Sequence, residues 1–297
     1  MDGIVNFFKP KGMTSHDAVY YFRRLYKTRK VGHTGTLDPM ATGVLPICIG
    51  KATRVSEYLL NVGKEYIGEL TLGSETDTQD KEGKIINYSN KEISEEDIKR
   101  VFNDFKGSKK QIPPMFSAKK IDGKKLYELA REGIIIERKA NDINISELKI
   151  LDIIDNKRVL FYAKVSKGTY IRTLCNDLGL ALGTYGHMSY LLRVGVGTFK
   201  LSDSYGMETL NQFSKEDKLL ALLPMDKALD HLKEIKMDAK DYKHLTNGLK
   251  LRVSSYEDII DNEPVRVYSG DEFIGIGKLI DENNTRFIKM DKVLIRW

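Results

Sequence analysis

The order of strand-like and helix-like segments constrains the fold of this chain more than any other feature of its sequence. Residues 65–72 alternate apolar and polar side chains, as half-buried strands do, and residues 159–165 are rich in strand-forming side chains. Residues 15–26 and 94–105 instead place apolar residues at helical spacing near a Ser. Residues 169–182 begin extended and become helical. Because these segments do not alternate as regular βαβ units would, the sequence predicts an α+β fold.

The last part of the chain has a different pattern, with short strand signals at close spacing. Four such segments follow residue 250, and turns such as Ser269-Gly270-Asp271 separate them. This pattern is typical of a small β-barrel of about 60 residues. With 297 residues, the chain is long enough for two domains. We therefore expect one domain over residues 1–230 and a small β-barrel domain over residues 231–297.

Composition and missing motifs exclude several classes of protein. No apolar run approaches the ~18 residues that a membrane span needs, and the N-terminus lacks the basic region of a signal peptide. The two cysteines, Cys48 and Cys175, lie alone in apolar surroundings, so redox and zinc chemistry are not expected. The Gly50-Lys51 pair lacks the other residues of a phosphate-binding P-loop. We expect a cytoplasmic protein that uses neither a metal nor a nucleotide cofactor.

Positive charge is concentrated in three blocks of the first 200 residues, although the whole chain has only 48 Lys and Arg against 42 Asp and Glu. Residues 1–66 contain 10 basic and 5 acidic side chains, and residues 101–140 have the same balance. Residues 161–200 contain 5 and 1, whereas residues 231–297 are neutral with 12 of each. Three basic blocks on one face would attract a polyanion such as a phosphate backbone. Separate solvated lysine-rich surfaces would give the same counts.

The densest local signal is the segment over residues 31–45, whose three Gly, one Pro and three Thr indicate a shaped loop. Asp38 is its only acid, and Pro39 restricts the backbone of Asp38 toward extended geometry. The loop then enters an apolar strand that can anchor it. A firmly anchored loop that presents one carboxylate is a common arrangement for a catalytic group. The alternative is an Asx-turn, in which Asp38 only bonds to nearby backbone.

Six ordered segments resemble those of the TruB family of bacterial tRNA pseudouridine-55 synthases, and the likeness runs through nearly all of residues 4–200. They are residues 6–17 (NFFKPKGMTSHD), 32–45 (GHTGTLDPMATGVL), 64–66 (KEY), 76–83 (TDTQDKEG), 113–118 with 123–127 (PPMFSA and GKKLY), and 168–174 (GTYIRTL). On weaker signals around residues 245–249, the C-terminal 60 residues resemble a PUA RNA-binding domain.

This resemblance implies a pseudouridine synthase fold with a mixed, largely antiparallel sheet and a small PUA-like β-barrel domain. It implies an isomerase that converts uridine 55 in the T-loop of tRNA to pseudouridine after extruding the base. That reaction breaks the N1–C1′ bond and joins C5 to C1′, so no redox partner or cofactor is expected. The expected partner is tRNA, bound by its T-arm and, through the C-terminal domain, by its acceptor stem. No membrane and no obligate protein partner are expected.

The resemblance assigns catalysis to three residues, Asp38, Tyr66 and Arg172. Asp38 would be the essential carboxylate, which attacks the ribose, attacks the base or removes a ribose proton. Arg172 would hold both oxygens of Asp38 with its fork, or else contact a phosphate at the surface. Tyr66 would stack on the uracil near C5, or else be a plain aromatic residue of the core.

The resemblance assigns substrate binding to seven further residues. His33 would fill the space that the flipped base leaves, or else hydrogen-bond within its own loop. Tyr170 and Leu191 would line the uracil pocket. The alternatives are that Tyr170 is a core aromatic residue and that Leu191 packs within a helix. Lys9 would also bind the RNA. Lys119, Lys124 and Lys125, with Lys120 beside them, would contact RNA phosphates or else form a solvated face.

One departure from the family pattern follows His187, where Leu191-Leu192-Arg193 stands in place of Leu-Arg-Arg, so one basic RNA contact is lost or replaced. Two other functions stay open: an RNA-binding or tRNA-folding module without catalysis, and a relative that depends on a guide RNA. The catalytic set argues against the first, because a pure binder needs no carboxylate that faces phosphates. The full insertion over residues 67–150 favours a stand-alone enzyme over the second.

Overall fold

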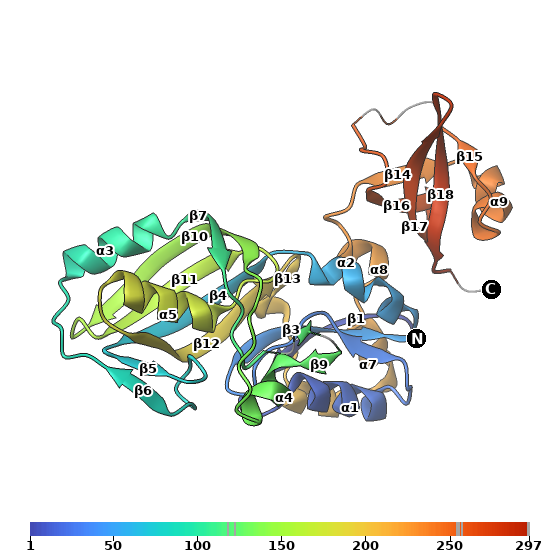
Figure 1. Ribbon diagram of the computed structural model, residues 1–297. Coiled ribbons are helices and arrows are strands. Elements are labelled where there is room, and N and C mark those ends of the chain that lie inside the picture. The colour runs from blue at the N-terminus through green and yellow to red at the C-terminus, as the bar shows by residue number, and fades with distance from the viewer. Residues whose placement is uncertain (118, 122, 254–255, 257, 296–297) are drawn as a thin grey trace.

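The computed structural model describes residues 1–117, 119–121, 123–253, 256 and 258–295, and it shows an elongated molecule (Figure 1). In this part of the chain, the larger sheet has nine strands in the order β1-β3-β12-β4-β11-β10-β7, with β2 beside β3 and β13 beside β12. Its neighbouring strands are antiparallel except for β3 and β12, which are parallel. The mixed, largely antiparallel sheet confirms the expected α+β fold.

The strands expected over residues 65–72 and 159–165 are β4 and β11. The larger sheet contains β1 (Gly3–Lys9), β2 (Val31–His33), β3 (Thr42–Ile49), β4 (Lys64–Leu72), β7 (Gly107–Gln111), β10 (Asn141–Ile154), β11 (Arg158–Val165), β12 (Gly186–Val196) and β13 (Phe199–Lys200). Two separate hairpins are formed by β5 (Ser74–Thr76) with β6 (Ile85–Tyr88), and by β8 (Lys120–Ile121) with β9 (Lys124–Lys125).

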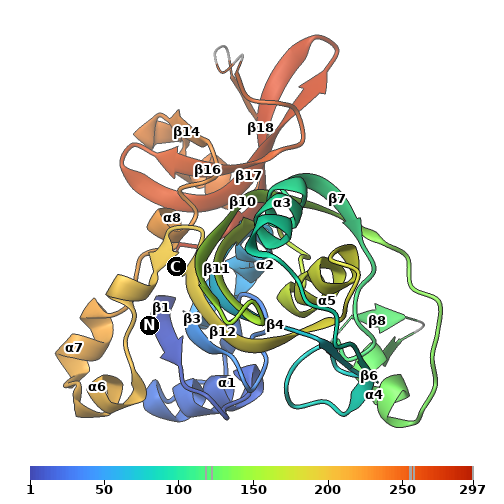
Figure 2. The same ribbon diagram turned by 90° about the vertical axis from the view of Figure 1, so that its left-hand side faces the viewer.

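Helices cover the two halves of the larger sheet separately. In one half, α3 (Glu95–Asp104) and α5 (Ile171–Ala181) lie within the curve of β4, β10, β11 and β12 (Figure 2). In the other half, α1 (Ser15–Leu25) packs against β2 and β3. Thr14 and Ser94 cap α1 and α3, because each side chain accepts a hydrogen bond from a backbone N–H of the first turn. No helix in the described residues is long and apolar enough to cross a membrane.

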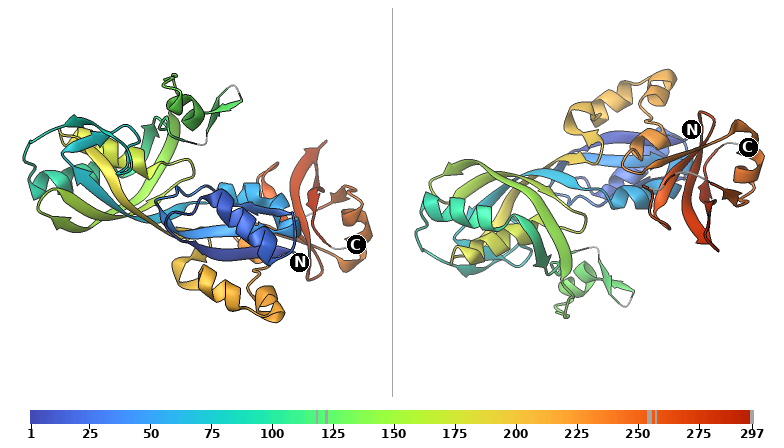
Figure 3. Two further views of the ribbon diagram at one scale, coloured as in Figure 1. Left: turned by 90° about the horizontal axis from the view of Figure 1, so that it is seen from below. Right: turned by 90° about the horizontal axis from the view of Figure 1, so that it is seen from above.

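The remaining helices before residue 230 are short connections. They are η1 (Gly50–Val55), α2 (Ser56–Leu60), α4 (Leu126–Arg131), η2 (Leu201–Asp203), α6 (Met207–Gln212), α7 (Lys215–Leu220) and α8 (Met225–Ala228). Together with β8 and β9, α4 belongs to the insertion between β7 and β10, which projects from the body of the molecule (Figure 3).

Separate apolar clusters fill the two halves of the larger part of the molecule. Phe102 and Phe161 pack together between α3, α5 and the sheet, whereas Phe7 and Phe22 pack between the sheet and α1. The apolar run of β3 is buried throughout from residue 43 to residue 49, as a central strand covered on both faces would be. Cys48 lies in this run, and burial raises the pKa of its thiol to about 12. Both cysteines are buried and free, as inert core residues would be.

The C-terminal part forms its own sheet, in the order β14-β16-β17-β18-β15, which curls into a half-barrel (Figure 1). Its elements are β14 (Glu234–Met237), η3 (Ala239–Asp241), α9 (Tyr242–Thr246), β15 (Leu251–Arg252), β16 (Pro264–Ser269), β17 (Glu272–Glu282) and β18 (Thr285–Val293). Ile235, Val267 and Leu279 belong to its separate core. The expected β fold of the C-terminal part is thus confirmed as a half-barrel sheet. Four of its strands coincide with expected segments, whereas β14 was not expected.

The C-terminal part rests on η1 and α2 of the larger part. Leu294 shares an apolar cluster with Ala52 and Leu59. The Nη1 of Arg54 donates a hydrogen bond to the carbonyl of Val293 at 2.7 Å. An ion pair between Lys292 and Glu57 adds to this contact. Removing residues 231–297 would therefore expose apolar surface of the larger part.

Candidate active site

A cavity of about 910 Å³ opens beside the loop that carries Asp38. Its wall includes this loop, β4, β12, the first turn of α5 and part of the insertion after β7. Five of the ten residues that the sequence singled out line it, although they are spread along the chain: Asp38, Tyr66, Tyr170, Arg172 and Leu191. The fold thus gathers all three expected catalytic residues in one concave site.

The backbone around Asp38 is held at every residue, because five consecutive carbonyl groups accept hydrogen bonds. The donors and distances are Arg193 Nη2 to Gly35 O (3.3 Å), Arg193 Nη1 to Thr36 O (3.3 Å), Ser15 Oγ to Leu37 O (3.0 Å), Ala41 N to Asp38 O (3.1 Å), and Gly12 N (2.8 Å) and Lys9 Nζ (3.4 Å) to Pro39 O. Ser15 also accepts from the N–H of Leu37 at 2.9 Å. The loop is therefore a rigid mount for the Asp38 side chain.

Arg193 is a scaffold residue, although it also borders the cavity. Only 2% of it is exposed, and its Nε donates to the carbonyl of Val44 at 2.6 Å. Its strand β12 pairs with β3 at Gly43, which has a φ of 109°. A Cβ atom at Gly43 would lie 2.2 Å from the carbonyl oxygen of Arg193, so only glycine permits this approach. Arg193 is the one basic residue in the segment 191–193, which departs from the family pattern. Its role is therefore to hold the loop of Asp38.

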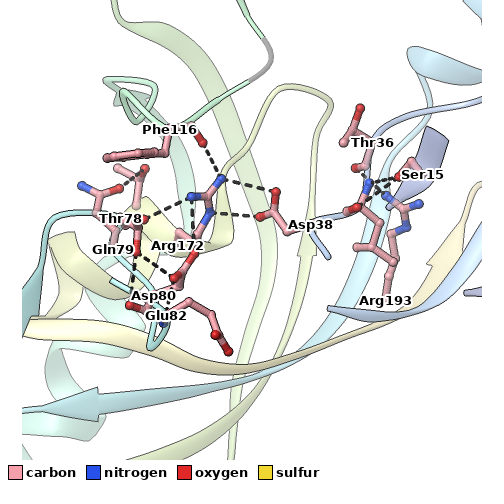
Figure 4. Close-up of polar contacts among 12 residues, drawn as sticks. Ser15, Thr36, Asp38, Thr78, Gln79, Asp80, Glu82, Phe116, Arg172 and Arg193 are labelled. Carbon is pink, nitrogen blue, oxygen red and sulfur yellow. Dashed lines mark hydrogen bonds and ion pairs between the residues drawn. The ribbon is translucent and has the colours of Figure 1, made fainter. Parts of the chain in front are cut away.

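Arg172 holds both carboxylate oxygens of Asp38 (Figure 4). Its Nε lies 3.0 Å from Oδ2, and its Nη2 lies 3.4 Å from Oδ1. Arg172 is nearly buried, whereas 34% of the Asp38 side chain is exposed toward the cavity. The carboxylate accepts no local backbone bond in the described residues, so the Asx-turn alternative is wrong. A fixed cation behind an accessible carboxylate holds that group in one orientation.

The opposite side of the Arg172 guanidinium contacts a second acid, Asp80. Nη1 lies 3.5 Å from Oδ2 of Asp80 and donates to the carbonyl of Thr78 at 3.1 Å, while Nη2 donates to the carbonyl of Phe116 at 2.8 Å. Asp80 is itself fixed, because its Oδ1 accepts from Thr78 Oγ1 at 2.7 Å and from the N–H of Glu82 at 3.1 Å. All three guanidinium nitrogens are therefore engaged.

Tyr66 and Leu191 lie on adjacent strands in the cavity wall. Tyr66 is opposite Arg193 in the pairing of β4 with β12, and Leu191 is opposite Gly68. The Tyr66 hydroxyl has no hydrogen-bond partner among the described residues, so it is free to bind a ligand. Leu191 belongs to a strand, so the alternative of helix packing is wrong. Tyr170 precedes α5, and its backbone N–H and carbonyl both bond to the Gln111 side chain.

Lys64 also lines the cavity, although no role was predicted for it from the sequence. Its Nζ donates to the carbonyls of Leu60 at 2.8 Å and Val62 at 2.7 Å. Burial lowers the pKa of Lys64 to about 8, and the cation of Arg193 adds to this effect. Asp80 was also missed as a partner of Arg172, although it belongs to the segment 76–83. Both contacts depend on tertiary structure, which local patterns do not report.

The expected RNA-binding residues lie elsewhere. His33 does not line the cavity. Its Nδ1 accepts a hydrogen bond from the N–H of Gly35 at 3.3 Å, which agrees with the alternative that His33 bonds within its own loop. Burial lowers the pKa of His33, and nearby Arg193 adds to the effect. In the insertion, Lys119 donates to Asn141 Oδ1 at 3.0 Å, and Lys124 is exposed. The side chains of Lys120 and Lys125 lie outside the described residues.

The expectation that Lys9 binds RNA needs correction. Lys9 has no exposed surface, and its Nζ donates to the carbonyls of Pro10 at 2.9 Å, Met13 at 2.7 Å and Pro39 at 3.4 Å. Burial lowers the pKa of Lys9 to about 8. A phosphate cannot reach an ammonium group that is enclosed by the chain, so Lys9 supports the loop of Asp38 instead. No cluster of metal-ligating side chains occurs among the residues that the structure describes.

Comparison with known proteins gives consistent matches along the chain. Residues 23–171 match the family model described as TruB family pseudouridylate synthase (N terminal domain), and residues 172–230 match the tRNA pseudouridylate synthase B C-terminal domain. A protein of Clostridioides difficile (strain 630), named tRNA pseudouridine synthase B, is 45% identical, and the match covers 99% of this chain and 100% of that one. A protein of the same name from Staphylococcus aureus (strain bovine RF122 / ET3-1) is 38% identical, with 98% and 99% covered.

Solved structures with the same fold are similar at lower identity. A crystal structure of a Cbf5-Nop10-Gar1 complex contains a chain that is 28% identical with a TM-score of 0.79, over 99% of this chain and 85% of that chain. A structure of an H/ACA RNP bound to a substrate RNA containing 2′-deoxyuridine gives 26% identity and a TM-score of 0.75, again over 99% and 85%.

Proposed function

The chain belongs to the TruB family of pseudouridylate synthases, and on this premise we propose that it converts uridine 55 in the T-loop of tRNA to pseudouridine. The substrate is supported by the names of relatives that match nearly the whole chain. The position within tRNA is supported by the likeness of the segments around Asp38, Tyr66 and Arg172. The reaction exchanges an N1–C1′ bond for a C5–C1′ bond, so atoms balance without an external group, and we propose a mechanism without a cofactor.

The observation that carries this proposal is the mounting of Asp38. Its carboxylate faces the cavity from a loop whose backbone is bonded at five successive carbonyls, and Arg172 holds both of its oxygens. Attack on the ribose, attack on the base and removal of a ribose proton all require an ionised and oriented carboxylate. We therefore propose Asp38 as the catalytic residue and Arg172 as its electrostatic partner.

We propose that Tyr66 acts at the end of the reaction, when a proton must leave C5. Its ring forms part of the cavity wall beside Leu191, where a flat base can stack. Its hydroxyl has no partner among the described residues, which suits a group that exchanges a proton with a ligand. Tyr170 and Leu191 would complete the uracil pocket.

A uridine inside a folded T-loop is stacked, so the enzyme must extrude it to reach C1′ and C5. We propose that His33 fills the vacated space, since it is the last residue of β2, where the loop of Asp38 begins. Lys119, Lys124 and Lys125 of the insertion would contact T-arm phosphates. The division into a catalytic domain over residues 1–230 and an RNA-binding domain over residues 231–297 is likewise a proposal, supported by the separate sheet and core of the C-terminal part.

Two alternatives lead to different observations. An RNA-binding module without catalysis would bind tRNA and leave uridine unchanged, but it would have no need for a carboxylate clamped by Arg172. A guide-dependent enzyme would modify RNA only when a second RNA is present. The high identity to relatives named tRNA pseudouridine synthase B favours direct action on tRNA.

The test is to incubate the purified protein with an unmodified tRNA transcript and to map pseudouridine by chemical sequencing. We expect product at position 55 with the wild-type protein alone. A transcript with cytidine at position 55 is the matched control for the site. Product at other positions only, or product that needs an added guide RNA, would contradict the proposed function.

A further inference from the structure

A second group of basic side chains lies outside the cavity, at the end of α1. We call Arg23, Arg24, Lys27 and Arg29 the α1 cluster. With Tyr20 and Thr28 they line a hollow of about 560 Å³ on the surface. Arg24, Lys27 and Arg29 are exposed, and Arg23 is half-buried. None of the residues that the mechanism uses belongs to this group.

Among the residues that the structure describes, the α1 cluster has no acidic partner. No carboxylate in the described residues lies within ion-pair distance of its four cations. The Nε of Arg23 is buried and has no hydrogen-bond partner. By contrast, Lys99 and Arg100 of α3 are each paired with an acid of their own helix. Basic residues in the last turn stabilise a helix dipole, but Lys27 and Arg29 lie beyond α1 and are not explained in that way.

Aromatic side chains connect the α1 cluster to the rim of the cavity. The guanidinium of Arg23 lies over the Tyr20 ring at 5.4 Å, and the ring of His16 meets Tyr20 edge-on at 4.7 Å. The spacing of these residues places them along one exposed face of the helix. Thr14, which caps α1, lines the cavity. The row therefore begins at the catalytic site and extends for the length of the helix, about 16 Å.

The row also has a defined direction. Figure 1 and the left view of Figure 3 both show α1 beginning near the middle of the molecule and running toward the end that carries the C-terminal domain. A stem that leaves a loop held in the cavity would pass along this helix. Unpaired cations and stacking-capable rings at regular intervals match a sugar–phosphate backbone, which repeats its charge at regular intervals. An acidic protein would not require alignment with the cavity.

We propose that the α1 cluster binds the backbone of the double-stranded stem that continues from the modified loop. This inference rests on the proposed function and adds a contact surface to it. Arg23 is held by Tyr20 in advance, so it can meet a phosphate with little loss of side-chain freedom. Because the row spans about 16 Å, a T-arm hairpin contains the whole contact, and the acceptor stem adds nothing to it.

The test removes three exposed charges together, as Arg24→Gln, Lys27→Gln and Arg29→Gln. We expect the Kd for a T-arm hairpin to rise at least about tenfold at 0.15 M salt, with the same loss for whole tRNA. Because three phosphate contacts disappear, the slope of log K against log salt should flatten by about 2 to 3. The value of kcat/KM should fall in proportion to the rise in Kd.

The matched control removes the same number of charges on and just after α3, as Lys99→Gln, Arg100→Gln and Lys106→Gln, and should leave binding and activity as in the wild type. If the wild type forms pseudouridine and the α1 variant binds the hairpin normally, the inference is wrong while the proposed function stands. If the wild type forms no pseudouridine but RNA binding still depends on the α1 cluster, the proposed function fails instead. Unchanged RNA affinity with lost binding to polyglutamate would show that the surface serves an acidic protein.

Discussion

Two buried arginines flank Asp38, and their surroundings differ in kind. Arg172 lies between two carboxylates and reaches the side chain of Asp38, whereas Arg193 donates only to carbonyl groups, including those of Gly35 and Thr36. One cation therefore orients the reacting group, and the other fixes the main chain beneath it. The comparison shows that a loop can present a carboxylate accurately when the side chain and the backbone are held by separate residues.

Replacement of Asp38 by Asn should abolish isomerisation and leave tRNA binding largely intact. The amide keeps the shape of the side chain but cannot attack carbon or accept a proton as a carboxylate does. The measurement is tritium release from C5 of the uracil, with filter binding of tRNA in parallel. Retained turnover would show that Asp38 is not the catalytic carboxylate, so that neither arginine would support one there.

Arg172→Lys should lower the rate by about 10²–10³-fold, which is typical for loss of a directed charge contact in an active site. Lysine keeps the charge but cannot span both oxygens of Asp38, which Arg172 contacts at 3.0 and 3.4 Å. Single-turnover kinetics with saturating enzyme isolates this step from binding. A rate within a few-fold of the wild type would indicate that Arg172 serves RNA binding instead of Asp38.

Tyr66→Phe tests the cavity wall rather than the two arginines. The ring can still stack, but the hydroxyl is absent, so we expect product formation to fall about 10²-fold with near-normal binding. Tyr162→Phe on the neighbouring strand β11 is the control, because Tyr162 does not line the cavity. If both variants turned over at the wild-type rate, Tyr66 would be a stacking platform only.

Arg193→Met should act mainly on stability. The change leaves the carbonyls of Gly35, Thr36 and Val44 without their donor, which should lower the free energy of unfolding by about 3 kcal/mol. We expect a smaller loss of rate than with Arg172→Lys, because Asp38 keeps its partner. Denaturant melts measure the change in the free energy of unfolding. Arg158→Met, at the surface, is the control. Equal stability of the two variants would contradict a scaffold role.

Removal of residues 231–297 should have the smallest effect on catalysis. These residues have zero net charge, so we expect only a moderate loss of affinity for whole tRNA and a slight decrease of the salt slope. Binding of an isolated T-arm hairpin should change less, because the hairpin lacks the acceptor stem. Thermal melts must first establish folding, since Leu294 packs against Ala52 and Leu59. An equal loss for both RNAs would contradict this division.

Local patterns were sufficient for most of the fold and for part of the site. Alternating side chains predicted β4, and a Ser cap with acids in the first turn predicted α3. The strand β14 was missed because it has four residues, of which only Ile235 is fully buried, so its pattern is too short to stand out. Asp38 stood out because it is the only acid in a loop of Gly, Pro and Thr.

The remaining site residues depend on contacts between distant segments. Lys9 lies in a basic block and was expected to bind RNA, yet its ammonium is enclosed by carbonyls that include one at Pro39, thirty positions along the chain. Asp80 and Arg193 act through bonds to α5 and to the loop of Asp38 in the same way. No periodicity reports such contacts, because the geometry arises only when the strands have assembled.

The manner in which the loop of Asp38 is anchored has a consequence for how this protein can diverge. The anchoring bonds end on main-chain carbonyls, so the exposed side chain at Thr36 can be exchanged without releasing the backbone. Gly43 has no such freedom, because any side chain would meet the carbonyl of Arg193. Substitutions are therefore tolerated on the outer surface of the loop but not at its base. Variants with new loop surfaces can arise while the position of the carboxylate is inherited unchanged.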